Sequence, residues 1–298
     1  MYNKKRAIYT AVRRQPLKIL ATVSTALPWL FAFAPAHAET LTLNNKIRLD
    51  GTFSQGGMVI GTCPSSRCAA YLDGKELIIT EKGQFVFGFG RDAAATSKLI
   101  TRSDSQASEN TVLKVKQRTY NVQRITGVPQ KTVTPPPEVA ERIRREQALV
   151  DAARAINSKR TDFVSGFTWP IQGRISGVYG SQRVYNGVPG NPHMGLDIAA
   201  PEGAKIRAPM SGKVRLSQPD LYFSGGTLIL DHGHGLFSSY IHMSKVIVRV
   251  GDEVKRGDVI GLVGSTGRAT GPHLDWRINW FNERLDPAFV VPPQVAKK

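Results

Sequence analysis

This 298-residue chain has few cysteines and few long apolar runs, and it lacks a nucleotide-binding motif. Its only cysteines are Cys63 and Cys68, and no second pair of ligands lies near them, which argues against a structural zinc site. In an exported protein, two cysteines this close together predict a disulfide that holds a hairpin tip. The glycine-rich stretch 261–267 lacks the Gly-Lys-Ser/Thr ending of a phosphate-binding loop, so nucleotide binding is not expected.

Acidic side chains are missing from the first 38 residues, which contain six lysines and arginines. An apolar run over residues 19–34 and an Ala-x-Ala sequence follow, as in a signal peptide that is cleaved after Ala38. A membrane anchor is the alternative, but the run is shorter than the ~20 residues of a spanning helix and Pro28 interrupts it. Arg13 and Arg14 also resemble a twin-arginine signal, but the usual aromatic residue is missing, so ordinary secretion is favoured.

Negative charge is in the minority throughout the chain, whose formal net charge is +17. Removal of the signal peptide would leave about +11, because six basic residues would go with it. A basic exported protein favours anionic surfaces such as phospholipid, lipopolysaccharide or cell-wall polymer. Nucleic acid is not expected as a partner, because the chain has an export signal and no recognition motif.

Residues 39–127 are predicted to form a small β-sandwich-like domain. Short apolar runs recur about every ten residues and are separated by turns such as Asp73-Gly74. These runs include residues 58–60, 77–79, 85–89 and 111–115. No set of catalytic groups clusters in this region.

Residues 128–165 are predicted to be a proline-rich linker and a helix. Three consecutive prolines, residues 135–137, form a stiff extended connection. The helix is expected from Glu138 to about Ser158, because proline directly precedes its first turn and no glycine interrupts it. Its narrow apolar stripe is typical of a surface helix that lies across a neighbouring domain. A role in peptide or membrane binding has no specific support.

Residues 166–298 are glycine-rich and strand-like, so the fold class expected for the whole chain is mainly β. Two stretches, 200–209 and 250–261, look like variants of one turn. Such turns also occur in lipoyl and biotinyl carrier domains. Those carriers display a modifiable lysine on a hairpin tip, and no clear counterpart of that lysine is present here.

Three short motifs in this region place imidazoles and carboxylates in a fixed order. Residues 193–197 read His-Met-Gly-Leu-Asp, His242 follows in Tyr-Ile-His, and residues 273–275 read His-Leu-Asp. A catalytic zinc ion takes three protein ligands and keeps an open position for water. His193 and Asp197 can supply two of these ligands if Gly195 allows a turn or bulge between them. Taken alone, that spacing is a weak signal.

Further motifs around these three make the pattern specific. Residues 197–203, 230–236, 264–267 and 271–274 follow in the same order as in the lysostaphin-type zinc peptidases, and the chain resembles that family over residues 169–286. The resemblance implies an antiparallel β-sheet domain and hydrolysis of peptide cross-links in bacterial peptidoglycan. The β-rich N-terminal half and linker helix also look like those of Gram-negative members, which implies a periplasmic location.

The resemblance also implies roles for single residues. His193 and Asp197 match two zinc ligands, and Asp275 stands at the position of the third. His242 and His273 match the catalytic pair that flanks the attacking water. One imidazole would accept the proton of that water, and the other would stabilise the oxyanion or protonate the leaving amine.

Asp275 is the one position that departs from the family pattern, which has histidine there. Aspartate binds zinc at about 2.0–2.2 Å, but its side chain is shorter than that of histidine, so the strand or the metal must shift. Two carboxylates would also neutralise a divalent ion, which predicts weaker Lewis acidity. Oxygen-rich ligation could admit manganese or another hard divalent metal in place of zinc.

Four other residues have competing interpretations. His232 and His234 form the only His-x-His of the chain, but the flanking glycines predict a turn and favour a structural or surface role. Arg183 and Tyr185 shortly precede His193 and are candidates for binding substrate carboxylates along the groove. Packing is the alternative for both.

Two functions are compatible with the motifs. The favoured one is a periplasmic zinc endopeptidase that acts on peptidoglycan, because four of the five site positions match the family. The alternative is a catalytically inactive peptidoglycan-binding regulator, such as an activator of a cell-wall amidase, although such relatives usually lose several site residues together. No stable membrane span is expected in the mature chain. The N-terminal domain could cover the groove, bind a partner or act as a spacer.

Overall fold

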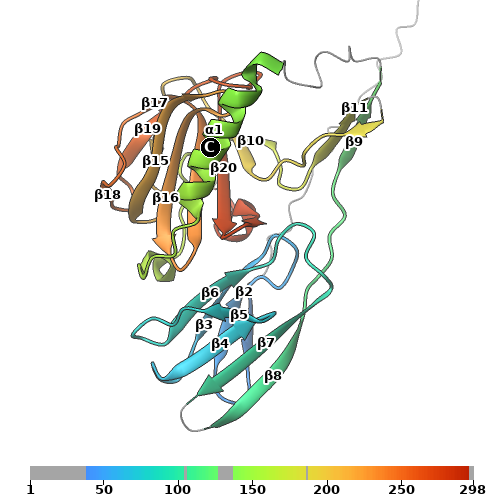
Figure 1. The fold of residues 1–298 in the computed structure, drawn as a ribbon, viewed down its shortest axis with the longest axis vertical. Helices are drawn as coiled ribbons and strands as arrows, with labels where there is room; N and C mark the ends of the chain where they lie inside the picture. The colour runs from blue at the N-terminus through green and yellow to red at the C-terminus, as the bar shows by residue number, and fades with distance from the viewer. Residues whose placement is uncertain (1–37, 104–105, 127–136, 186, 295–298) are drawn as a thin grey trace, which may run out of the picture. The chain divides into compact units, whose positions relative to one another are not determined.

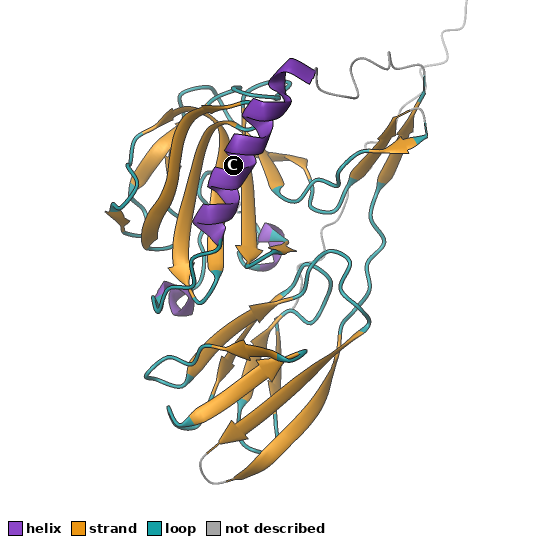
Figure 2. Ribbon diagram, in the orientation of Figure 1, coloured by secondary structure: helices purple, strands orange, loops and turns teal. Residues whose placement is uncertain are grey.

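The computed structural model describes residues 38–103, 106–126, 137–185 and 187–294. The expected signal peptide and proline linker lie outside the described residues, except for Ala38 and Pro137. The described residues belong to one compact unit. It is mainly β, as the sequence predicted (Figure 1, Figure 2). In the described part, no helix has both the length and the apolar character needed to cross a membrane.

Two four-stranded antiparallel sheets form the region before the linker, in agreement with the predicted β-sandwich-like fold. The first has the order β1-β2-β3-β6 and consists of β1 (Glu39–Thr42), β2 (Arg48–Gly51), β3 (Met58–Thr62) and β6 (Gln84–Gly88). The second has the order β5-β4-β7-β8 and consists of β4 (Cys68–Leu72), β5 (Lys75–Leu77), β7 (Thr96–Ser103) and β8 (Gln106–Lys114). Side chains of β7 alternate between buried and less buried positions, because successive residues of a strand face opposite sides.

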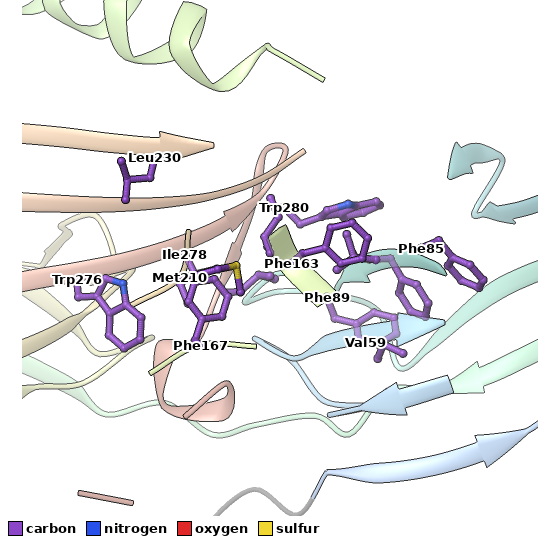
Figure 3. Close-up of a cluster of buried hydrophobic side chains, with 14 of the residues drawn as sticks. Val59, Phe85, Phe89, Phe163, Phe167, Met210, Leu230, Trp276, Ile278 and Trp280 are labelled. Carbon is purple, nitrogen blue, oxygen red and sulfur yellow. The ribbon is translucent and has the colours of Figure 1, made fainter. Parts of the chain in front are cut away.

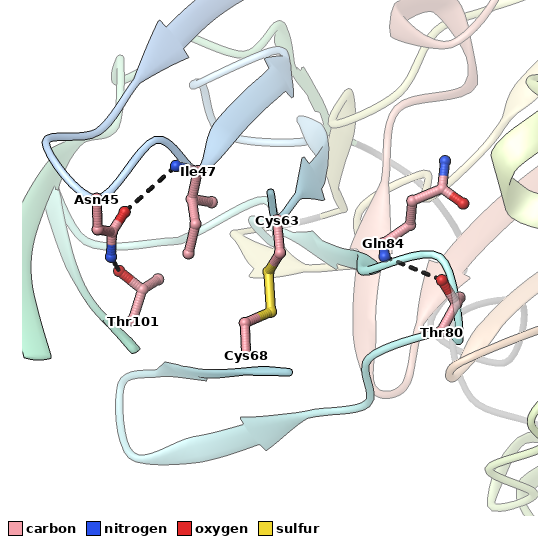
Figure 4. Close-up of a disulfide and its surroundings, with 7 residues drawn as sticks. All are labelled: Asn45, Ile47, Cys63, Cys68, Thr80, Gln84 and Thr101. Carbon is pink, nitrogen blue, oxygen red and sulfur yellow. Dashed lines mark hydrogen bonds between the residues drawn. A yellow bond between two sulfur atoms is a disulfide. The ribbon is translucent and has the colours of Figure 1, made fainter. Parts of the chain in front are cut away.

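Cys63 and Cys68 form the predicted disulfide (Figure 4). The bond does not hold a hairpin tip, because β3 and β4 belong to different sheets and each pairs with other strands. It closes the connection through which the chain passes from the first sheet to the second. The cysteine spacing could not show this, since it carries no information about which strands pair.

A three-stranded sheet joins segments from both sides of the linker. Its order is β12-β11-β9, with β9 (Val122–Ile125), β11 (Gln182–Tyr185) and β12 (Val188–Pro189). β9 and β11 run parallel, whereas β11 and β12 are antiparallel.

The predicted helix is α1 (Ala140–Arg154), which follows the short 3-10 helix η2 (Pro137–Val139). It ends at Arg154 rather than near Ser158, and the Ser158 hydroxyl donates a hydrogen bond to Asp231 in the large sheet. Ala153 is buried against that sheet in a cluster with Leu216, Leu221, Ile229 and Phe237. The helix therefore lies across the sheet as expected (Figure 1).

The region after α1 is built on one sheet of ten strands. Along its main path the order is β10-β13-β20-β17-β16-β15-β18, while β14 pairs with β19, β19 also pairs with β17, and β21 pairs with β20. The strands are β10 (Arg174–Gly177), β13 (Leu196–Ala199), β14 (Lys205–Arg207), β15 (Gly212–Leu221), β16 (Gly225–Gly233), β17 (Leu236–Val246), β18 (Glu253–Val254), β19 (Val259–Val263), β20 (His273–Trp280) and β21 (Glu283–Leu285). Two further 3-10 helices are η3 (Asp162–Ser165) and η4 (Pro287–Phe289).

Strand β20 separates the apolar core from the polar side chains. Its apolar residues Leu274, Trp276, Ile278 and Trp280 are buried in the main core, and the last three of them are seen in Figure 3. The residues between them face the opposite side, because side chains alternate along a strand. These are His273, Asp275, Arg277 and Asn279. This polar face of β20 positions the candidate site.

Candidate functional site

His193, Asp197 and Asp275 lie together on the polar face of the sheet. One possible ligand atom from each residue lies within 4.8 Å of the others. His193 is in the irregular segment before β13, and the chain bends at Gly195 before Asp197 enters that strand. The register of β13 and β20 then places Asp197 directly opposite Asp275.

Two of the three donors have atoms without a hydrogen bond. Nε2 of His193 and Oδ1 of Asp197 are both buried and lie 3.2 Å apart as a possible ion pair, and neither makes a hydrogen bond to any other residue. Buried polar atoms are normally paired, because an unpaired one costs on the order of 1–3 kcal/mol. An imidazole nitrogen and a carboxylate oxygen that face each other in this way fit the donor chemistry of a zinc site.

Two glycines make room for the carboxylates. A Cβ atom on Gly177 would lie 2.1 Å from Oδ2 of Asp197. A Cβ atom on Gly195 would lie 2.4 Å from Oδ1 of Asp275 and 2.8 Å from the backbone oxygen of Trp276. A larger residue at either position would therefore displace a donor.

Arg277 is a site residue to which the sequence motifs did not point. Its Nε donates to Oδ1 of Asp275 at 3.0 Å, and its Nη2 donates to Oδ2 at 2.6 Å. Burial is the largest single effect and would raise the pKa of Asp275, but the charge and hydrogen bonds of Arg277, together with the neighbouring histidines, lower this pKa overall. The spacing of Asp275 and Arg277 could have indicated this contact, since residues two apart on a strand face the same side.

The Arg277 guanidinium changes the charge of the predicted ligand set. With His193 neutral, the carboxylates of Asp197 and Asp275 contribute two negative charges, and Arg277 reduces the sum to one. The family's ligand set, one carboxylate and two neutral histidines, also has a net charge of minus one. The expected loss of Lewis acidity is thus offset in part. Each carboxylate oxygen has more than one lone pair, so Asp275 can accept from Arg277 and still bind a metal.

His242 and His273 lie beside the three donors, with their ring centres 4.9 Å apart. Nδ1 of His242 is 2.8 Å from the backbone oxygen of Thr266, and Nδ1 of His273 is 2.7 Å from that of Gly271. In a neutral ring these carbonyls place the proton on Nδ1 and leave Nε2 free to accept another. Nε2 of His273 is 3.8 Å from Oδ1 of Asp197, so the ring borders the donor cluster.

The environment of His242 suits a proton acceptor. Burial lowers the pKa of His242, which favours the neutral ring near pH 7. Its backbone is in the left-handed region with φ of 65°. Such backbone strain is found in proteins mainly where the position of a residue serves a function.

His232 and His234 take structural positions outside the donor cluster. Both ring nitrogens of His232 are engaged, at 2.7 Å each, by the Ser211 carbonyl and the Ser238 hydroxyl. Burial lowers the pKa of His232 to about 4. His234 is buried and packs against Phe163, with ring centres 4.8 Å apart.

Arg183 and Tyr185 are both in β11, outside the donor cluster. Arg183 is exposed, and its Nε donates to Oε1 of Gln123 in β9 at 3.4 Å. Substrate binding by these two residues stays a prediction.

Comparison with known proteins connects this geometry to a family. Residues 191–287 match peptidase family M23. Peptidoglycan DD-endopeptidase ShyB of Vibrio cholerae is 39% identical over 95 residues, or 32% of this chain and 22% of that protein. DD-carboxypeptidase/endopeptidase Mpg of Neisseria meningitidis is 36% identical over 101 residues, or 34% of this chain and 23% of that protein. The chain thus spans less than a quarter of the length of these curated relatives.

A crystal structure from Pseudomonas aeruginosa, described as an M23 peptidase, overlaps more widely. It is 31% identical, has a TM-score of 0.61, and the match covers 80% of this chain and 94% of that one. The likeness therefore extends well beyond residues 191–287.

Proposed function

Because the chain belongs to peptidase family M23, we propose that it is a peptidoglycan endopeptidase whose divalent metal ion is held by His193, Asp197 and Asp275. The observation that carries this proposal is the convergence of His193, Asp197 and Asp275, each of which has a possible ligand atom within 4.8 Å of the others. The names of ShyB and Mpg support an endopeptidase activity. The comparisons give no support to the alternative of an inactive regulator.

The histidine pair divides the proton transfers of hydrolysis. A bound metal would supply Lewis acidity that polarises the scissile carbonyl and acidifies the attacking water. His242, neutral and with its proton on Nδ1, accepts the proton of that water at Nε2. His273, with its ring centre 4.9 Å away, stabilises the oxyanion or returns a proton to the leaving amine.

We further infer that the protein acts in the periplasm on the cross-link between a D-alanine and a diamino acid. The basic n-region and the Ala-x-Ala sequence before residue 39 support export. The net positive charge expected after cleavage favours binding to the anionic wall.

The experiment uses purified protein, peptidoglycan sacculi and metal analysis. Zinc is expected to bind at one equivalent and to support hydrolysis of the cross-links, which is measured as loss of cross-linked muropeptides from the sacculi. His242→Ala and His273→Ala should each lower kcat/KM on the order of 10²–10⁴-fold. Both variants should keep their zinc, because neither residue is among the three donors.

Asp197→Ala provides the comparison within the site, since it removes a donor and should lose the metal as well as the activity. The proposal fails if no metal binds at stoichiometric zinc and no cleavage occurs with zinc, manganese or another divalent ion. It also fails if both histidine variants keep full activity.

A further inference from the structure

A polar cavity lies on the same face of the sheet as the donor cluster. Its volume is about 450 Å³, and cationic and amide side chains dominate its lining. The charged and amide residues that line it are Lys75, Arg154, Arg284, Asn279, Asn282 and Asp151. Asn282 and Asp151 are exposed, so the cavity is open to solvent on that side.

The register of the strands relates this cavity to the metal donors. Asn279 lies four residues beyond Asp275 on the same face of β20, which is about 14 Å along the strand. Arg284 is directly opposite Asn279 in β21. About four residues of an extended peptide span the same length. One bound peptide chain can therefore reach both places.

The lining groups have unmet hydrogen-bonding capacity. Nε of Arg154, Nη1 of Arg284 and Oδ1 of Asn279 are all buried without a hydrogen-bond partner. Asn279 is fully buried, with an exposed fraction of 0%. The two guanidinium nitrogens can only donate, whereas the amide oxygen accepts. A ligand that satisfies all three atoms needs acceptor oxygens for the two guanidinium groups and a nearby N–H donor.

Electrostatics also favours an anion in the cavity. Burial and the neighbouring charges of Arg284 and Arg277 lower the pKa of Arg154 to about 9. Burial and the charge of Arg277 lower the pKa of Arg284 to about 10. Asp151 is the one carboxylate of the lining, and Gln147 already donates to it. The cavity therefore has an excess of positive charge.

Anchoring of α1 explains only part of this arrangement. Nη2 of Arg154 donates to the Ser239 hydroxyl at 3.1 Å and so ties the helix to β17. A guanidinium has five N–H donors, and this contact uses one of them. The contact between Arg154 and Ser239 also leaves the burial of Arg284 unexplained.

We propose that this cavity is a substrate subsite that binds a free carboxylate of the peptide chain. Arg154 and Arg284 donate to the carboxylate, and Oδ1 of Asn279 accepts from the N–H of an adjacent peptide bond. The proposal rests on the proposed function for the source of the peptide, since peptidoglycan stem peptides have free carboxylates. An amidated stem peptide should bind poorly for the same reason.

The test measures binding to metal-free protein by calorimetry, so that no cleavage intervenes. Two synthetic stem peptides are compared, one with free side carboxylates and one with the same groups amidated. Wild-type protein should bind the free form about tenfold more tightly, which is the worth of one hydrogen bond to a charged group. Arg284→Met and Arg154→Met should both lose this preference. Arg145→Met is the matched control, because Arg145 is an exposed arginine of the same helix.

Several outcomes would overturn the subsite. These are equal affinity of wild-type protein for the two peptides, retention of the preference in Arg284→Met, and binding of inorganic phosphate without discrimination between the peptides.

Removal of one of two repelling buried cations should leave the unfolding temperature unchanged or higher. A lower unfolding temperature of Arg284→Met would mean that the arginine serves the fold. If the preference is present but sacculi are not cleaved, the subsite stands and the endopeptidase proposal fails.

Discussion

Arg277 donates to both carboxylate oxygens of Asp275 from two positions further along β20. Only 3% of the Asp275 side chain is exposed, compared with 29% of that of Arg277. Removal of one member of a buried ion pair leaves an uncompensated charge, which costs far more than loss of the whole pair. Asp275 and Arg277 must therefore be considered together.

Asp275→His alone is expected to weaken zinc binding about tenfold or more. The new histidine is neutral, so Arg277 would be left unpaired beside a divalent cation and would repel it. Asp275→His combined with Arg277→Gln should recover the affinity. Competition titration with a zinc-binding dye compares the single and the double variant with wild type. Tighter binding by the single Asp275→His variant would contradict the coupling.

Gly195→Ala is expected to lower zinc occupancy without preventing folding. The added Cβ would lie 2.4 Å from Oδ1 of Asp275, so the carboxylate must move. Gly271→Ala is the matched control, because a Cβ there meets no atom within 4 Å. Metal analysis and thermal unfolding of both variants check the prediction. Equal zinc content in the two variants would count against it.

His232 is expected to make the fold sensitive to acid. Burial lowers its pKa from the ordinary 6.5 to about 4, so the unfolded chain binds this proton first as pH falls. Stability is therefore lost between pH 6.5 and about 4, by about 3 kcal/mol, and this contribution is constant below that range. Urea unfolding at several pH values measures the slope. In His232→Gln the slope should be shallower, and an unchanged slope would assign the acid sensitivity to other groups.

Loss of the disulfide is expected to lower the free energy of unfolding by about 2 kcal/mol. Cys63 and Cys68 are separated by five positions, and a loop this short restricts the unfolded chain only modestly. Denaturant unfolding of the Cys63→Ala/Cys68→Ala variant checks the value. A reductant should destabilise wild-type protein to a similar degree and leave the variant unchanged. An effect of the reductant on the variant would show that another process is being measured.

Local patterns in the sequence predicted much of the fold. Alternating apolar residues indicated a mainly β chain, and prolines before an uninterrupted helical stretch located α1. These features depend on neighbours within a few positions, so the sequence contains them directly. The order of the histidine and aspartate motifs likewise indicated which side chains belong to the site.

Long-range pairing accounts for what the sequence could not show. Nothing near Cys63 and Cys68 in the chain indicates that β3 and β4 enter different sheets. The β13–β20 register that sets Asp197 opposite Asp275 joins segments about eighty residues apart, and a shift of one residue would turn one of these side chains away. The pairing of Arg277 with Asp275, and the meeting of Arg154 with Arg284 at one cavity, likewise depend on packing between distant segments.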